Sequence, residues 1–159
     1  MDTDPRPAPV SRLTDHTGYW LNRLRADVHG SFERALAGLG ITVAQWNVLV
    51  VLYHDTAATP QALATALAID SGAVTRLLDR LAAKGLLARA PSTADRRSVE
   101  LALTPAGRAL TPTLAALADR NDAAFLGPLS AAERRQFRAL LARLLEARGV
   151  AVTPRWRDE

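Results

Sequence analysis

Residues 70–107, DSGAVTRLLDRLAAKGLLARAPSTADRRSVELALTPAG, decide the fold of this chain of 159 residues. In AVTRLLDRLAAK the apolar side chains recur every three or four residues, which predicts a helix, and Gly85 is a typical stop at its end. Asp70, Ser71 and Gly72 predict a tight break in front of that helix. LLARA and the alternating VELAL predict two strands joined by the polar loop PSTADRRS. The stretch therefore predicts a helix followed by a β-hairpin.

Two more helices are predicted upstream of this stretch. Thr42 and Gln45 have the spacing of a capping box, in front of a nearly all-apolar helix that closes at His54-Asp55-Thr56. Thr59-Pro60 is a second start signal, an N-cap followed by proline at the first helical position, and it opens the short helix QALATALAI. Two short helices joined by a tight turn form a helix-turn-helix, and a hairpin after them forms a wing.

Long amphipathic helices are predicted on both sides of this unit. Residues 16–40 carry one apolar face, and the helix that follows the capping box of Ser130 and Glu133 carries another. Such faces need another surface to cover them, and we expect dimerisation, although packing within one chain is the alternative. We predict a mainly α fold with a small β-hairpin wing, a winged helix-turn-helix with N- and C-terminal dimerisation helices. Its parts are a flexible arm at 1–14, a dimerisation helix at 15–40, the winged helix-turn-helix lobe at 41–104, dimerisation helices at 105–148 and a tail at 149–159.

The composition excludes several classes of protein. Apolar residues make up 48% of the chain, enough for a core, and the formal net charge is +4, which suits an anionic partner. Lys84 is the only lysine; the arginine bias suits contacts to phosphates and guanines, but high genomic GC content explains it equally well. With no cysteine, disulfides, thiol redox sensing and thiolate zinc sites are excluded. The sequence contains no membrane-spanning apolar run and no signal-peptide core, so we expect a cytoplasmic protein without a metal or cofactor.

The beginning of the predicted second helix of the turn has the residue types of a DNA-reading element. Ser71 and Gly72 are small, which lets a helix end approach base edges closely, and free amides at that end suit a phosphate. Ser71, Thr75 and Arg76 are candidates for contacts to bases or backbone, with Arg76 the best guanine reader. Arg80 lies one turn further on, within reach of the backbone. A solvated surface is the alternative for each arginine.

The hairpin loop carries the sharper signal. Paired arginines, Arg96 and Arg97, at a hairpin tip suit the narrow minor groove, where the negative potential is enhanced. Asp95 beside them repels phosphate, but it makes sense as a brace that holds an arginine by a charge-assisted hydrogen bond. An ordinary polar turn is the alternative, because aspartate favours turns in any case.

These residues resemble the multiple antibiotic resistance regulator (MarR) family. Asp95-Arg96-Arg97 is followed, at the family's spacing, by Leu103-Thr104-Pro105-Ala106-Gly107. Upstream, residues 71–86 resemble the family's recognition helix and the start of its wing. The resemblance covers roughly residues 15–148 and implies a triangular dimer whose first and last helices interlock. It also implies that Arg97 enters the minor groove, that Asp95 braces the wing and that Arg96 touches the backbone.

Members of this family usually repress genes near their own, and many release DNA when a small aromatic acid binds. The family's pocket lies between the dimer helices and the DNA lobe. An aromatic wall with one cation suits a phenolic acid. The candidates for the wall are Tyr19, Trp20, Trp46 and His54, and those for the cation are His16 and Arg23. Alternatively, Trp46 belongs to the core and Trp20 to the dimer interface.

Two other classes of protein compete with a DNA-binding regulator. An enzyme is disfavoured because the three histidines are scattered and the sequence has no glycine-rich phosphate loop, so no catalytic or metal residues are assigned. A winged helix that only binds proteins has no need for a basic face, yet residues 70–108 carry seven cationic against four acidic side chains. We therefore predict a repressor that binds double-stranded DNA with a palindromic operator as a homodimer and is released by a small aromatic ligand. The alternative is a winged-helix interaction module without sequence-specific DNA binding.

Overall fold

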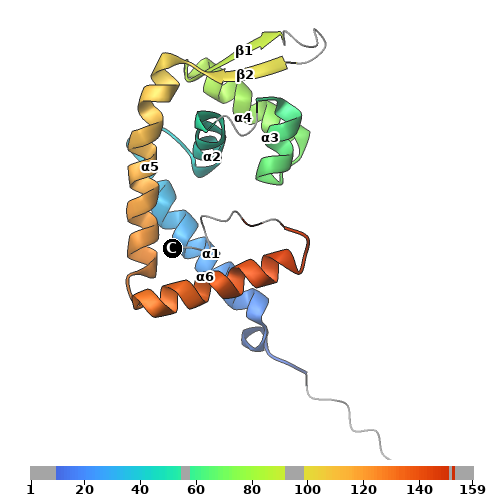
Figure 1. Cartoon of the computed structure of the whole chain (residues 1–159), viewed down its shortest axis with the longest axis vertical. Coiled ribbons are helices and arrows are strands. Elements are labelled where there is room, and N and C mark those ends of the chain that lie inside the picture. The colour runs from blue at the N-terminus through green and yellow to red at the C-terminus, as the bar shows by residue number, and fades with distance from the viewer. Residues whose placement is uncertain (1–9, 55–57, 92–98, 151, 153–159) are drawn as a thin grey trace, which may run out of the picture. The chain divides into compact units, whose positions relative to one another are not determined.

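The computed structural model describes residues 10–54, 58–91, 99–150 and 152, and within these ranges it holds six α-helices, a short 3₁₀ helix and one two-stranded sheet (Figure 1). The predicted mainly α winged helix-turn-helix is confirmed. Most of the predicted arm (1–9) and of the tail (151 and 153–159) lies outside the described residues. In chain order the elements are the 3₁₀ helix Leu13–Asp15, α1 Thr17–Ala37, α2 Val43–Tyr53, α3 Pro60–Leu67, α4 Ser71–Ala83, β1 Leu87–Pro91, β2 Val99–Leu103, α5 Pro105–Leu126 and α6 Ala131–Glu146.

The chain divides into two compact units, Met1–Leu117 and Ala118–Glu159, and the boundary falls inside α5. The first unit contains the whole helix-turn-helix and the hairpin, together with α1 and the first half of α5. The second contains the rest of α5 and α6. Among the described helices, none is long and apolar enough to cross a membrane.

Capping side chains fix where three of the helices begin. The Thr42 hydroxyl accepts from the Gln45 amide, and the Gln45 side chain accepts from the Thr42 amide, so the predicted capping box is confirmed. Thr59 caps α3 in front of proline, also as predicted. Helix α4 begins at Ser71, two residues before the predicted Ala73. Asp70 is its N-cap and accepts from the Ala73 amide at 2.9 Å, so the expected break is the first turn of the helix.

Helix α2 lies at the centre of the first unit and packs against α1, α3, α4 and β2. Its side chains Val48 and Leu49 are fully buried, which explains why this helix is apolar on nearly every side. One hydrogen bond ties the segment before α3 to the edge of β2, since the Ala58 carbonyl accepts from the Leu101 amide at 2.8 Å. Leucines from the surrounding elements complete the core: Leu36, Leu63, Leu78, Leu81 and Leu114.

The hairpin is anchored at one end and exposed at the other. Strands β1 and β2 pair antiparallel, from Leu87 opposite Leu103 to Pro91 opposite Val99. Leu87 and Leu101 are buried, whereas Pro91 and Val99 at the far end are exposed. Figure 1 shows the two strands extending beyond α4. The predicted β-hairpin, which rested on the alternation of apolar and polar residues in VELAL, is therefore confirmed.

The second unit also begins its main helix with a capping box. Ser130 and Glu133 cap each other's backbone amides, as the sequence predicts. The side-chain hydroxyl of Ser130, and then its backbone amide, hold the pKa of the Glu133 carboxyl below its ordinary value. Arg138 Nη2 lies 3.5 Å from Asp122 Oδ2, an ion pair between α6 and the end of α5.

Candidate nucleic-acid interface

Helix α4 separates buried apolar side chains from an exposed polar face. Val74, Leu78 and Leu81 point into the core. The face turned to solvent holds all five of the α4 residues that the sequence analysis selected for DNA contact: Ser71, Gly72, Thr75, Arg76 and Arg80. Because residues four apart lie on one side of a helix, these five residues form one strip about two turns long.

Small residues at the start of α4 make room for its arginine. A Cβ atom on Gly72 would lie 3.5 Å from Arg76 Nη1 and 3.1 Å from Asp70 Oδ1, so the guanidinium lies beside the first turn of the helix. The Thr75 hydroxyl donates to the Ser71 carbonyl at 3.0 Å, which leaves the rest of the threonine side chain on the outer surface. The guanidinium donors of Arg76 and the helix N-terminus therefore lie at the same end of α4.

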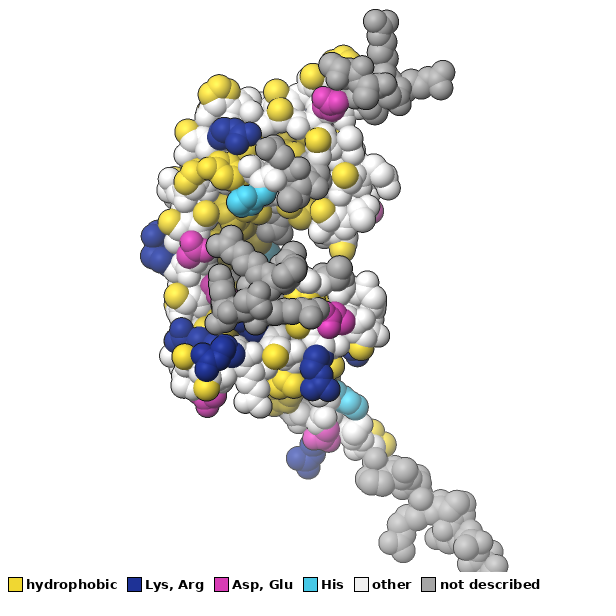
Figure 2. Space-filling view, in the orientation of Figure 1, with side chains coloured by type: hydrophobic (Ala, Val, Ile, Leu, Met, Phe, Trp, Pro, Cys, Tyr) yellow, Lys and Arg dark blue, Asp and Glu magenta, His cyan; other side chains and the backbone are white. Residues whose placement is uncertain are grey.

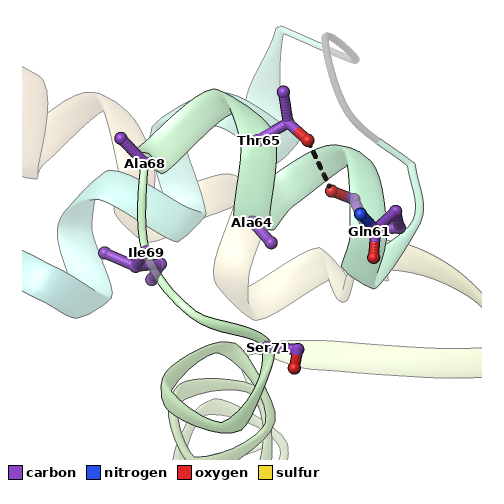
Figure 3. Close-up of a pocket in the computed structure, with 6 residues that line it drawn as sticks. All are labelled: Gln61, Ala64, Thr65, Ala68, Ile69 and Ser71. Atoms are coloured by element: carbon purple, nitrogen blue, oxygen red, sulfur yellow. Dashed lines mark hydrogen bonds between the residues drawn. The ribbon is translucent and has the colours of Figure 1, made fainter.

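A hollow of about 440 Å³ lies beside this end of α4 (Figure 3). Residues of α3, of the turn and of the start of α4 line it, and all but Ile69 are small or polar: Gln61, Ala64, Thr65, Ala68, Ile69 and Ser71. The Thr65 hydroxyl donates to the Gln61 carbonyl at 3.2 Å (Figure 3). Helix α3 was not predicted to contact DNA, although Gln61 and Thr65, polar residues four apart among alanines, were a signal for an exposed polar face.

The root of the wing is tied to α4 by an ion pair. Arg89 Nη2 on β1 donates to Asp79 Oδ1 on α4 at 2.7 Å, and neither side chain is buried. The predicted wing residues Asp95, Arg96 and Arg97 lie outside the described residues. The described strands show that the loop connects Pro91, the end of β1, to Val99, the start of β2.

Charge alone does not mark this interface. In the view of Figure 2, Lys and Arg side chains (dark blue) are spread over the surface among hydrophobic ones (yellow). The formal net charge of the chain is only +4. The assignment therefore rests on the geometry of α4 and the wing.

Four of the six predicted ligand residues lie at the start of α1, and two of them are in contact. The rings of Tyr19 and Trp20 pack edge to face, with centroids 5.0 Å apart. Trp20 Nε1 donates to the Thr14 carbonyl at 2.9 Å, and the side chain stays 53% exposed. His16 Nε2 lies 3.1 Å from the Ser11 hydroxyl, and Arg23 is exposed on the next turn of the helix.

The other two ligand candidates, Trp46 and His54, are on α2 and at its C-terminal end. Trp46 is only 9% exposed and meets Phe32 edge to face at 6.2 Å, so its ring is part of the core. His54 packs edge to face on Tyr53 at 5.5 Å. The Arg108 guanidinium of α5 lies 5.5 Å from the centre of the same tyrosine ring, a cation–π arrangement. The structure thus divides the six candidates between the start of α1 and helix α2 with its C-terminal end, and it buries Trp46 among core side chains.

A winged helix-turn-helix with an exposed polar strip on its second helix is the arrangement typical of DNA-binding transcriptional regulators. The MarR family model matches residues 41–99. The multiple antibiotic resistance protein MarR of Salmonella typhimurium is 43% identical over 102 residues, 64% of this chain and 66% of that protein. The chain thus spans just under two thirds of that relative.

Solved structures match over a larger share. The chain is similar to a mutant of MarR from E. coli complexed with operator DNA, with 30% identity, a TM-score of 0.79 and coverage of 85% of this chain and 99% of that one. It is similar also to BpsR of Bordetella bronchiseptica, from a structure that concerns regulation of DNA binding by 6-hydroxynicotinic acid. For BpsR the identity is 30%, the TM-score is 0.77, and coverage is 86% of this chain and 97% of that one.

The chain belongs to the MarR family of transcriptional regulators. The predicted resemblance is confirmed, and so is the prediction that the protein is not an enzyme.

Proposed function

We propose that this regulator is a repressor that binds a palindromic operator as a homodimer and leaves it when a small aromatic acid binds. The observation that carries the proposal is the division of α4 into a buried apolar face and an exposed strip of small, hydroxyl and guanidinium side chains. A helix of this kind enters the major groove with its N-terminal end towards the bases. A repressor acts by occupying its operator.

Each residue of the strip has a role that follows from its chemistry. Arg76 presents paired donors to the O6 and N7 acceptors of a guanine. Ser71 and Gly72 keep the helix end narrow, so that its backbone approaches a phosphate closely, while the Asp70 carboxylate takes up the Ala73 amide. Thr75 offers its methyl group to a thymine, and Arg80, one turn on, pairs with the backbone.

The wing adds a second contact. By the family resemblance, Arg97 enters the minor groove, Asp95 braces it and Arg96 meets the backbone. The Asp79–Arg89 ion pair holds the root of β1 on α4, which supports a fixed distance between the two contacts. Backbone and minor-groove contacts then set the register in which Arg76 meets its base.

A second copy of the chain is the partner that suits the exposed apolar side chains. On α1, Trp20, Leu21 and Leu24 are each more than 40% exposed, and on α6 Leu140 and Leu144 are too. Clusters of this kind are unusual on monomers and mark interaction sites. The resemblance assigns both helices to the dimer interface, and a two-fold dimer matches a palindromic operator.

The ligand proposal rests on the start of α1. Tyr19 and Trp20 supply an aromatic surface, and His16 and Arg23 supply cations for a carboxylate. The related BpsR is regulated by 6-hydroxynicotinic acid, an aromatic acid of the proposed class. His54, exposed at the C-terminal end of α2, remains in the proposal, whereas Trp46 is left out because its ring is part of the core.

Substitution of Arg76 tests the proposal. Arg76→Ala removes one bidentate base contact and should cost about 1–3 kcal/mol of binding free energy on cognate DNA, with a smaller loss on random DNA. Fluorescence anisotropy on both duplexes measures this difference. Arg135→Ala, at an exposed position on the side of α6 opposite Leu144, is the matched control and should bind both as the wild type does. Equal losses on the two duplexes would show that Arg76 contacts phosphate, and absence of any DNA binding by the wild type would favour the interaction module.

A further inference from the structure

Lys84, at the C-terminal end of the proposed recognition helix α4, binds the segment that joins α1 to α2. It is the only lysine among the 20 cationic side chains and is the C-cap residue of α4. Its ammonium donates to the Gly40 carbonyl and, at 2.9 Å, to Gln45 Oε1. These partners lie 44 and 39 residues away in the sequence, so the contact joins three separate segments of the first unit.

The acceptors of Lys84 are held firmly. Gln45 is only 3% exposed, and its Oε1 also accepts from the Thr42 amide at 3.2 Å, as part of the capping box of α2. Gly40 has a φ of +64°, a conformation that glycine adopts without strain, and its amide donates to the Ala37 carbonyl at the end of α1. The two oxygens therefore converge from fixed backbone, and one compact ammonium with three donors can face both.

The same connection is tied to the body of α1. Glu33 Oε1 accepts from the Val43 amide at 2.8 Å, and His29 Nε2 lies 3.7 Å from the same oxygen. Polar contacts thus run from α1 through the start of α2 to Lys84 and the end of α4. Since α1 also carries the exposed apolar side chains near its beginning, this path links the proposed dimer helix to the proposed DNA-reading helix.

Lys84 lies at the wrong end of α4 to touch the bases. The helix has 13 residues, so its two ends are about 20 Å apart at about 1.5 Å per residue. The strip of Ser71, Thr75 and Arg76 is at the N-terminal end. An effect of Lys84 on base recognition therefore passes through the orientation of α4.

We infer that Lys84 is a positioning residue that fixes the orientation of the recognition helix relative to α1, and so sets the ratio of cognate to random DNA affinity. The inference rests on the proposed function. A loosely held α4 loses base contacts, which need a fixed orientation, before it loses phosphate contacts, which do not. Coupling between distant sites through such a network is expected to change affinity about 2- to 30-fold.

The test compares the wild type with Lys84→Met on a cognate duplex and a random duplex of equal length. Binding is measured by anisotropy well below the unfolding temperature, over a range of salt concentrations. We expect Lys84→Met to lower cognate affinity about 2- to 30-fold, with random-duplex affinity and its salt slope unchanged. Lys84→Arg keeps the charge, and its affinity for the cognate duplex should lie between those of the wild type and Lys84→Met. Arg135→Gln removes one exposed positive charge from α6 and should match the wild type.

Gln45→Met supplies a second measurement because it removes the same contact from the other side. If Lys84 acts through Gln45, the double variant Gln45→Met/Lys84→Met binds no more weakly than the weaker single variant. Unchanged cognate affinity in Lys84→Met would overturn the inference. So would an equal loss on both duplexes with a salt slope lower by about one, which is the behaviour of a phosphate contact. A wild type that fails to distinguish the two duplexes would instead contradict the proposed function.

Discussion

Gly107, the last residue of the Leu-Thr-Pro-Ala-Gly segment, lets the start of α5 pack closely against the backbone of Leu86. Gly107→Ala should therefore lower the stability of the fold. A Cβ atom at position 107 would lie 2.1 Å from the Leu86 carbonyl oxygen and 3.0 Å from its carbon. Ordinary contact begins near 3.4 Å, so α5 and the backbone of Leu86 would have to separate by more than 1 Å.

The surrounding hydrogen bonds oppose that movement. The Thr104 amide donates to the Leu86 carbonyl at 3.2 Å, and the Thr104 hydroxyl donates to the Gly85 carbonyl at 2.6 Å. Overpacking costs about 1–3 kcal/mol and one lost hydrogen bond about 0.5–1.5 kcal/mol, against about 1 kcal/mol gained in helix propensity. The net effect is a destabilisation of about 2 kcal/mol.

Urea unfolding followed by far-UV circular dichroism measures this change. Gly18→Ala is the matched control, since Gly18 also lies in the first turn of a helix and a Cβ there meets no heavy atom within 4 Å. The control should be neutral or stabilised by up to about 1 kcal/mol. If Gly107→Ala unfolds at the same urea concentration as Gly18→Ala, the steric reasoning is refuted.

Three further substitutions test separate features. Ala68 has a φ of +52°, which costs an L-residue about 1–2 kcal/mol, so Ala68→Gly should raise the free energy of unfolding by up to about 1 kcal/mol and with it the urea midpoint; a lower midpoint contradicts this. The lowered pKa of Glu133 stabilises the fold fully above its ordinary value of 4.5, and this stability is lost as the pH falls through the lowered pKa. Glu133→Gln should therefore be less stable than the wild type at pH 7, with the gap closing in acid unfolding curves; a constant gap opposes the assignment. Arg97→Ala should weaken operator binding strongly while sizing chromatography shows an intact dimer, and near-wild-type affinity by anisotropy contradicts the minor-groove assignment.

Local features of the fold were predictable from the sequence because their partners are a few residues apart. Thr42 with Gln45 and Ser130 with Glu133 are capping boxes in which each side chain meets an amide three residues away. The hairpin strands follow from the alternation of VELAL. The start of α4 at Ser71, two residues before the predicted one, comes from the capping side chain of Asp70, which turns an apparent break into the first helical turn.

Contacts between distant segments were not predictable in the same way. Nothing in the sequence pairs Lys84 with Gly40, or Arg89 with Asp79, because the packing of the helices decides which exposed side chains meet. Ala68 adopts a left-handed backbone conformation, which a glycine at that position would have predicted and an alanine does not. For the candidate interface, the α4 strip follows from helical periodicity, whereas the hollow beside α3 emerges only when the turn brings the two helices together.

Selection of genomic DNA fragments with the purified protein, followed by a salt titration on the best fragment, tests the central claim most directly. A dimeric reader should enrich a palindrome whose half-sites lie about one helical turn apart, and its affinity should fall steeply as salt rises. Failure to enrich any site, by a protein that is dimeric in solution, would contradict the claim and favour an interaction module.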